Sequence, residues 1–205
     1  YVGCNSISNT AGLQRFTKAT NTWTNITPSG LDARVPDLEL SSTGRFHVIC
    51  GYYNTAAGSA GYRYTDNPAT VSSGTWTSPA TTFPTQYNVA IESNGNTLYA
   101  LPSNSAWGVP TIYKSTNGGA NWAATGATPA FTSGQAWYCM AVAIDPNNAN
   151  NVIVGSLDCY KTTNGGTSWT KISEWVGTTG QYVHADQQII TWRNNNQVLF
   201  GCDGG

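Results

Sequence analysis

Residues 112–124 read IYKSTNGGANWAA and residues 159–171 read CYKTTNGGTSWTK, two copies of one pattern. In each copy an aromatic–basic pair leads into a polar Asn-Gly-Gly turn, and a tryptophan follows. Trp23 and Trp76 stand in similar Thr-Trp-Thr contexts, so the four tryptophans are spaced by 53, 46 and 47 residues. Regular spacing of this kind indicates an internal repeat.

Each repeat contains four short apolar runs separated by Gly, Asn, Pro and Ser turns. Residues 140–144 and 152–155, for example, flank the turn sequence Asp-Pro-Asn-Asn at 145–148. No segment shows sustained helical periodicity. Four strands in every 40 to 50 residues are typical of a propeller blade, which must stack on its neighbours to bury both faces. We therefore expect an all-β chain, a β-propeller of four-stranded blades; a β-sandwich or a solenoid is the alternative.

We expect residues 1–205 to form a single propeller segment. Residues 35–80, 86–127 and 137–175 read as full blades, whereas residues 1–30 and 182–205 supply only part of a blade each. This count favours an excerpt of a larger propeller, within a larger polypeptide.

The composition excludes several classes of protein. Charged residues make up 9% of the chain, aromatic residues 12%, and the net charge is −1. Disordered chains are poor in aromatics, and nucleic-acid binders carry a basic field. No apolar run approaches the ~20 residues that span a bilayer. The low charge favours an extracellular or cell-surface location.

Five widely spaced cysteines leave two alternatives open: buried thiols, or at most two disulfides, with Cys139 and Cys159 as the best candidate pair.

The two turns resemble the Asp-box of bacterial-neuraminidase-repeat propellers, with Asn in place of Asp. The physical logic is local, because a short acceptor side chain can bond backbone donors of its own turn and glycine permits positive φ. The resemblance implies structural rather than catalytic roles for Ser115, Asn117, Gly119, Trp122, Thr162, Asn164, Gly166 and Trp169.

Residues 182–205 look like the blade entry of sortilin-type and xyloglucanase-like repeats of secreted bacterial proteins. The resemblance lies in Tyr-Val-His-Ala-Asp at 182–186 and Cys-Asp-Gly-Gly at 202–205. It implies the superfamily and no particular activity.

Five polar residues are candidates for the mouth of the central channel. Asp37 and Asp186 start innermost strands and form the candidate catalytic pair of a glycoside hydrolase. The alternative is that such residues bond the backbone of a neighbouring blade. His184, Asp158 and Asp203 are candidate binding residues. We expect no metal site, since His47 is the only other histidine, and no cofactor, since no glycine-rich loop precedes a helix.

Trp107 is the best candidate for a ring that stacks on sugar, because its loop offers it no evident core face; Tyr52, Tyr53, Trp137 and Tyr138 also lie near strand ends. We therefore expect a non-catalytic secreted or surface module for binding, adhesion or scaffolding, with a glycan or another surface protein as partner. The alternatives are a xyloglucanase-like glycoside hydrolase and a propeller that docks a protein or peptide.

Overall fold

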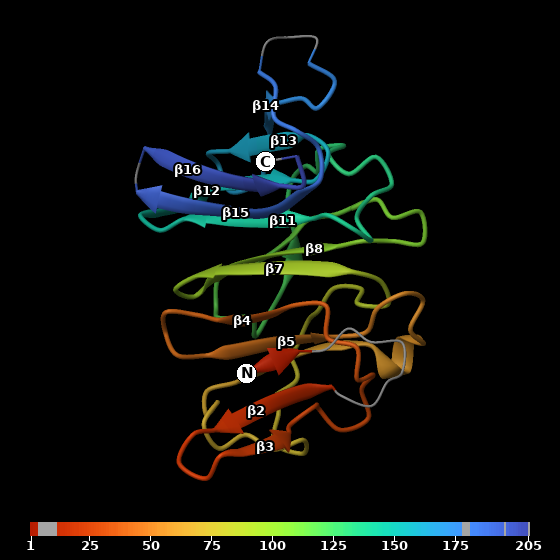
Figure 1. Ribbon diagram of the computed structural model, residues 1–205, viewed down its shortest axis with the longest axis vertical. Helices are drawn as coiled ribbons and strands as arrows, with labels where there is room; N and C mark the ends of the chain where they lie inside the picture. Colours follow the sequence, from red (N-terminus) through yellow and green to blue (C-terminus); the bar gives the residue numbers. More distant parts are fainter. Residues whose placement is uncertain (4–11, 178–180, 195, 205) are drawn as a thin grey trace.

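The computed structural model describes residues 1–3, 12–177, 181–194 and 196–204 (Figure 1). Five antiparallel sheets stack along the long axis in chain order, and we number them 1 to 5 from the N-terminus. Consecutive strands are hydrogen-bonded neighbours within every sheet. The expectation of an all-β chain built from small repeated sheets is confirmed.

The strands of the first two sheets are short, and a single 3-10 turn, η1 (Ala57–Ser59), interrupts the loop between β5 and β6. Sheet 1 contains β1 (Val2–Gly3), β2 (Leu13–Thr17) and β3 (Thr22–Asn25). Sheet 2 contains β4 (Leu38–Leu40), β5 (Phe46–Cys50) and β6 (Gly61–Thr65).

The remaining sheets have longer inner strands. Sheet 3 contains β7 (Val89–Asn94), β8 (Thr97–Pro102), β9 (Tyr113–Ser115) and β10 (Ala123–Ala124). Sheet 4 contains β11 (Ala141–Asp145), β12 (Asn148–Gly155), β13 (Cys159–Thr162) and β14 (Thr170–Ser173). Sheet 5 contains β15 (Gln187–Asn194) and β16 (Gln197–Cys202).

Sheet 2 has three named strands, where its sequence suggested four. The place of the fourth is taken by an isolated bridge, in which Thr77 and Tyr64 exchange two backbone hydrogen bonds of 2.9 and 3.1 Å. Pro79 follows two positions after Thr77, and a proline cannot donate to a continuing ladder. The outer edge of this sheet is therefore reduced to a single residue pair.

The hydrophobic core lies between the sheets, because both faces of the second strands are apolar. In β5, Val48 faces sheet 1 while Ile49 faces sheet 3. In β8, Leu98 packs toward sheet 2 and Tyr99 toward sheet 4. Side chains alternate between the faces of a strand, so each of these strands contributes to two cores at once. This is the packing of propeller blades, in which a sheet cannot be stable without its neighbours.

Three of the four repeated tryptophans contact the preceding unit. Trp122 is 5% exposed and packs with Tyr62 of sheet 2, with its Nε1–H donating to Gly119 O of its own turn. Trp76 and Trp169 donate to Ile26 O and Ala127 O of the preceding units. Trp23 belongs to sheet 1, which has no preceding sheet among the described residues, and it is 58% exposed.

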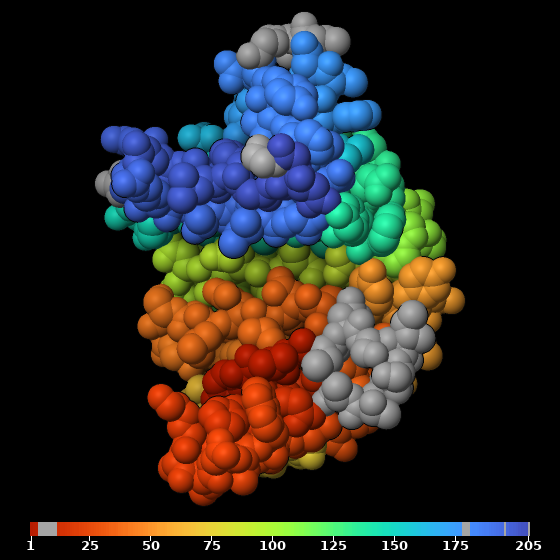
Figure 2. Space-filling view, in the orientation of Figure 1, coloured from red at the N-terminus to blue at the C-terminus, as the bar shows by residue number. Residues whose placement is uncertain are grey.

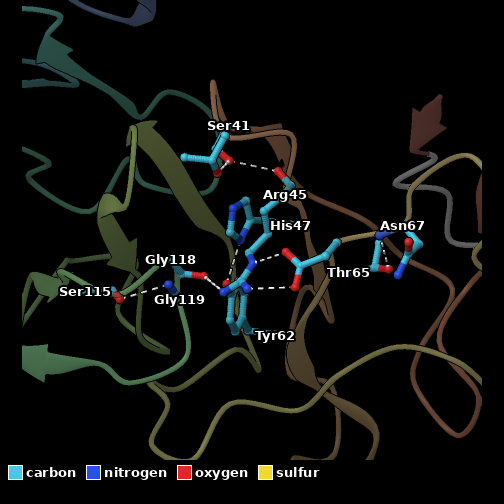
Figure 3. Close-up of polar contacts among 11 residues, drawn as sticks. Ser41, Arg45, His47, Tyr62, Thr65, Asn67, Ser115, Gly118 and Gly119 are labelled. Carbon is cyan, nitrogen blue, oxygen red and sulfur yellow. Dashed lines mark hydrogen bonds and ion pairs between the residues drawn. The ribbon is translucent and has the colours of Figure 1, made fainter.

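Polar contacts also join sheets 2 and 3 (Figure 3). The Arg45 guanidinium lies between Asp66, which it binds through two nitrogens at 2.6 and 2.8 Å, and Gly118 O at 2.9 Å. Beside it, His47 Nδ1 lies 2.7 Å from the Tyr62 hydroxyl, and both rings are buried. Burial, aided by the Arg45 charge, lowers the His47 pKa to about 4, so this histidine is neutral at physiological pH.

The two Asn-Gly-Gly turns connect the third and fourth strands of sheets 3 and 4. Ser115 Oγ accepts from Gly119 N at 2.9 Å, and Asn117 Oδ1 accepts from Asn121 N at 2.9 Å. The second turn repeats this pattern. Thr162 Oγ1 accepts from Gly166 N at 3.0 Å, and Asn164 Oδ1 accepts from Ser168 N at 3.0 Å. The polar side chains of both turns are thus occupied within the turns themselves.

Of the two alternatives left open for the cysteines, the structure has the thiols: Cys50, Cys139, Cys159 and Cys202 are free, so the candidate Cys139–Cys159 disulfide is not formed. Cys139 Sγ instead lies 3.1 Å from Ser156 Oγ, and burial raises the Cys139 pKa to about 12. The thiol therefore behaves as a small buried group without thiolate character. Cys4 lies outside the described residues.

Within the ranges that the structure describes, no helix is both long and apolar enough to cross a bilayer.

Candidate functional site

An aromatic rim joins the loops of sheets 2, 3 and 4 on the side that carries η1, at the right of Figure 1. It consists of Tyr52, Tyr53, Tyr87, Trp107, Trp137 and Tyr138. The Trp107 ring centroid lies 6.1, 5.6 and 5.4 Å from those of Tyr52, Tyr53 and Tyr87. Trp137 and Tyr138 pack against each other at 5.3 Å, and the Tyr52 hydroxyl donates to Trp137 O at 3.0 Å. The structure thus brings Trp107 together with the other aromatic residues near strand ends.

Half of the rim is open to solvent. Tyr53 is 65% exposed, Trp137 48% and Tyr138 45%. Large aromatic side chains usually bury most of their surface, and gathered exposed rings mark interaction sites. The rim therefore offers flat apolar faces to a ligand while its inner rings hold the outer ones in place.

The Thr55 hydroxyl holds the loop of Tyr52 and Tyr53. Its oxygen accepts from Tyr52 N at 2.9 Å and from the Arg34 guanidinium at 2.8 Å, and the hydroxyl donates to Tyr52 O at 2.9 Å. Arg34 is itself paired with Asp32, whose pKa it lowers through a side-chain hydrogen bond. Tyr53 and Asn54 are consequently kept at φ angles of 52° and 58°, which are uncommon for residues with a Cβ.

The loop of Trp107 is closed by the Asn104 side chain. Asn104 Oδ1 accepts from Ala106 N at 3.0 Å and from Gly108 N at 3.1 Å, and Trp107 N donates to Asn104 O at 2.9 Å. Trp107 has a left-handed backbone with φ of 56°. Such conformations persist only where neighbouring bonds impose them, and they concentrate at functional sites.

The C-terminal candidates gather at one end of the rim. Asp203 accepts hydrogen bonds from the Tyr138 hydroxyl and from Gln188 Nε2, the latter at 3.2 Å. Asp186, with φ of 66°, accepts a 3.4 Å hydrogen bond from Cys139 Sγ. The hydrogen bond of His184 is local: its Nδ1 lies 2.9 Å from Ala185 O, not from either carboxylate.

Asp37 bridges two sheets. Its Oδ1 accepts from Leu38 N and its Oδ2 from Ile91 N of β7, both at 2.8 Å. Burial raises the Asp37 pKa to about 7, although both backbone hydrogen bonds favour the ionised form. This bonding is what the structural alternative of the sequence analysis describes, a carboxylate used to join neighbouring blades.

A cleft of about 530 Å³ runs along the inner strands β4, β7, β11 and β15, which the sequence analysis expected to line a central channel. Glu39 and Glu92 lie in it beside Asp37, and Glu39 Oε1 accepts from Ser93 Oγ at 2.5 Å. Burial raises the Glu92 pKa to about 8, and the charges of Glu39 and Asp37 act in the same direction. Asp37 and Glu92 on the cleft wall therefore resist ionisation.

Asp37 and Asp186 do not line this cleft together. Asp37 lines it, whereas Asp186 is absent from its described wall and belongs to sheet 5, two sheets removed from the neighbour that Asp37 contacts. Asp158 is used locally, in an ion pair of 2.9 Å with Lys171 and a 3.3 Å hydrogen bond from Trp175 N. Among the described residues, no three His, Cys, Asp or Glu side chains are grouped to hold a metal ion.

Sequence reasoning missed three residues of these sites. Tyr87 lies two positions before an inner strand and Tyr138 three positions before the next one, so an alignment of the segments before inner strands would have found it. Glu39 and Glu92 both interrupt apolar inner strands, in Leu-Glu-Leu and Ile-Glu-Ser. A charged residue flanked by such strand residues is the signal that was overlooked.

Neither a protein-family model nor a curated protein matches the sequence. Among solved structures, the chain is similar to one described as "YCF48 bound to D1 peptide". The TM-score is 0.55 at 15% identity, over 94% of this chain and 55% of that one. This likeness agrees with the stacked sheets and the interleaved cores. The fold is that of a β-propeller.

Two structures of GH74 enzymes give weaker matches. The enzyme of Niastella koreensis matches with a TM-score of 0.40 and 17% identity, over 90% of this chain and 39% of that one. The xyloglucanase of Xanthomonas campestris matches with a TM-score of 0.37 and 12% identity, over 89% and 30%. The chain spans about half the length, or less, of all three structures.

Proposed function

We propose that this propeller segment is a non-catalytic binding module whose aromatic rim stacks on neutral glycans. The observation that carries the proposal is the pairing of Tyr53 with Trp107, two packed rings on left-handed backbones in different loops. Each such conformation costs about 1–3 kcal/mol. Structures retain that cost where the placement of a side chain matters, and here the side chains that are placed are flat and apolar.

Hydrolysis is less well supported than binding. A glycosidase needs two carboxylates flanking one bond, about 5 to 9.5 Å apart. Both oxygens of Asp37 already accept main-chain hydrogen bonds, and Asp186 is bonded by the buried Cys139 thiol. Asp37 therefore has both oxygens engaged, and Asp186 is not among the residues that line the cleft beside it.

Docking of a protein segment is the second candidate function. The observation that favours it is that a similar propeller is described as bound to a peptide. The exposed rings of Trp137 and Tyr138 suit apolar peptide side chains as well as sugars. We further propose that the module is extracellular or at the cell surface and belongs to a larger polypeptide. We also propose that its two Asn-Gly-Gly turns are Asp-box turns in which Asn replaces Asp.

The test is affinity electrophoresis through gels containing neutral or charged polysaccharides. We expect neutral polysaccharides to retard the wild type and Trp107→Ala to lose about tenfold in affinity. Trp23→Ala is the control, because Trp23 is an exposed tryptophan on sheet 1, away from the rim, whereas Trp107 is half-buried. No retardation by any neutral polysaccharide, or equal losses in the two variants, would overturn the proposal. Retention on peptide arrays alone would favour the second function.

A further inference from the structure

A pocket of about 220 Å³ adjoins the rim at Tyr87, which lines it, whereas Trp107 is not among its lining residues. Its walls come from the segment before β7 and from the loop between β8 and β9. They include the rings of Tyr87 and Tyr113 and three prolines, Pro84, Pro102 and Pro110. No charged side chain lines it. The prolines fix the backbone φ on three sides, so the pocket is pre-formed.

Three polar side chains of this pocket make no hydrogen bond within the described part of the chain. Gln86, Ser105 and Thr111 line it, and none of their side chains makes a hydrogen bond to the residues that the structure describes. An amide and two hydroxyls supply both donors and acceptors. The pocket therefore combines two aromatic rings with free neutral hydrogen-bonding groups.

Tyr87 connects this pocket to the rim. Its ring meets Trp107 edge-on at 5.4 Å and 89°, and its hydroxyl lies 3.2 Å from Asn54 Oδ1 in the loop of Tyr53. Tyr87 thus belongs to both the rim and the pocket, so a single extended ligand can contact the two regions.

We propose that this pocket binds one uncharged pyranose unit of a glycan whose neighbouring units stack on the rim. The inference rests on the proposed function and adds a second contact region to it. A pyranose has an apolar C–H face for the tyrosines and a hydroxyl edge for Gln86, Ser105 and Thr111. A uronic acid or sialic acid is disfavoured, since no cation is present to pair with its carboxylate and burying an unpaired charge is costly.

The test compares oligosaccharides of different length by titration calorimetry. The probes are neutral β-1,4-linked glucose, xylose and mannose oligomers of two to six units. The pocket variant is Q86M/T111V, which removes the amide and one hydroxyl at nearly constant volume. The control is Thr116→Val, at an exposed threonine in the Asn-Gly-Gly turn of sheet 3. Far-UV circular dichroism checks that the variants are folded.

We expect Q86M/T111V to weaken the longer oligomers about fivefold or more while leaving the shortest one that binds unchanged. Thr116→Val should alter neither. Equal affinities of wild type and Q86M/T111V at every length would overturn the pocket and leave the rim proposal standing. If Trp107→Ala loses binding to oligomers of every length while Q86M/T111V keeps it, the pocket proposal is likewise overturned and the rim proposal stands. Failure of the wild type to bind any of the three oligomer series would overturn both the pocket proposal and the rim proposal. Binding of a proline-rich peptide that Q86M/T111V abolishes would reassign the pocket to protein docking.

Discussion

The indole of Trp107 stands edge-on to the ring of Tyr87, with centroids 5.4 Å apart and planes at 89°. The two residues are 20 positions apart, yet β7 and β8 are antiparallel and pair Val89 with Pro102. A residue two positions before one strand therefore meets the loop after the other. This juxtaposition makes one surface from two loops, and Tyr87 also lines the neighbouring pocket.

Asn104 holds Trp107 without belonging to the rim. Asn104→Ala removes the acceptor for Ala106 N and Gly108 N, so we expect a loss of about 1–2 kcal/mol in the free energy of unfolding and weaker glycan binding. Asn104→Asp keeps an acceptor oxygen and should preserve both. Urea unfolding and calorimetry measure the two effects. Unchanged binding in Asn104→Ala would mean that Trp107 keeps its position without this side chain.

Gly119 is required for two reasons that can be separated. It has φ of 81°, and a Cβ there would overlap the Tyr62 hydroxyl, whereas Gly44 has φ of 86° with open space around it. Gly44→Ala should cost about 1–2 kcal/mol from backbone strain alone. Gly119→Ala should cost about 1–3 kcal/mol more through overpacking. Equal losses in chemical unfolding would show that Tyr62 moves aside freely.

The repeated tryptophans should differ in their contribution to stability. Trp122→Phe loses the bond from Nε1 to Gly119 O and part of a buried ring, so we expect a cost of about 1–3 kcal/mol. Trp23→Phe alters an exposed side chain and should stay within about 0.5 kcal/mol of wild type. Thermal and urea unfolding of both variants measure the difference. A comparable loss in Trp23→Phe would indicate that its exposed face is covered in solution.

Glu92 should make stability fall as the pH rises. Its pKa is raised from 4.5 to about 8, so the folded protein keeps a proton that the unfolded chain releases. The resulting stabilisation is complete below pH 4.5 and is lost as the pH rises through 8. Glu92→Gln imitates the protonated form, and we expect it to exceed wild type by a few kcal/mol at pH 8 and to match it near pH 4.

Urea unfolding across this pH range makes the comparison. The lowered pKa of His47 makes the folded protein less stable as the pH falls from 6.5 to about 4. The raised pKa of Asp37 makes it less stable as the pH rises, as that of Glu92 does. His47 is unchanged in the variant, so its contribution cancels in the difference, whereas the influence of the Asp37 charge on Glu92 is part of the effect measured. A difference that does not vary with pH would contradict the burial of Glu92 as the cause.

Much of the fold could be predicted from the sequence, because its signals are local. The alternation of apolar residues, the Asn-Gly-Gly turns and the tryptophan spacing all act within one repeat, and they led to stacked small sheets. The exposed Trp23 could not be foreseen, since its environment depends on a sheet that would have to precede its own. The prediction of a fourth strand in sheet 2 was wrong for a related reason. Whether the residues around Thr77 form a strand depends on how they pair with the edge strand β6.

The candidate site divides in the same way. The sequence by itself determined that the chain is a repeated all-β protein and that Trp107 has no core position within its repeat. Only the tertiary structure decided that Tyr53, Tyr87 and Trp107 share one surface, and that Asp37 bonds Ile91 N of the next sheet. The physical reason is range. Turn chemistry and strand periodicity act over a few residues, whereas the contacts of a side chain at a sheet end are set by how separate repeats stack.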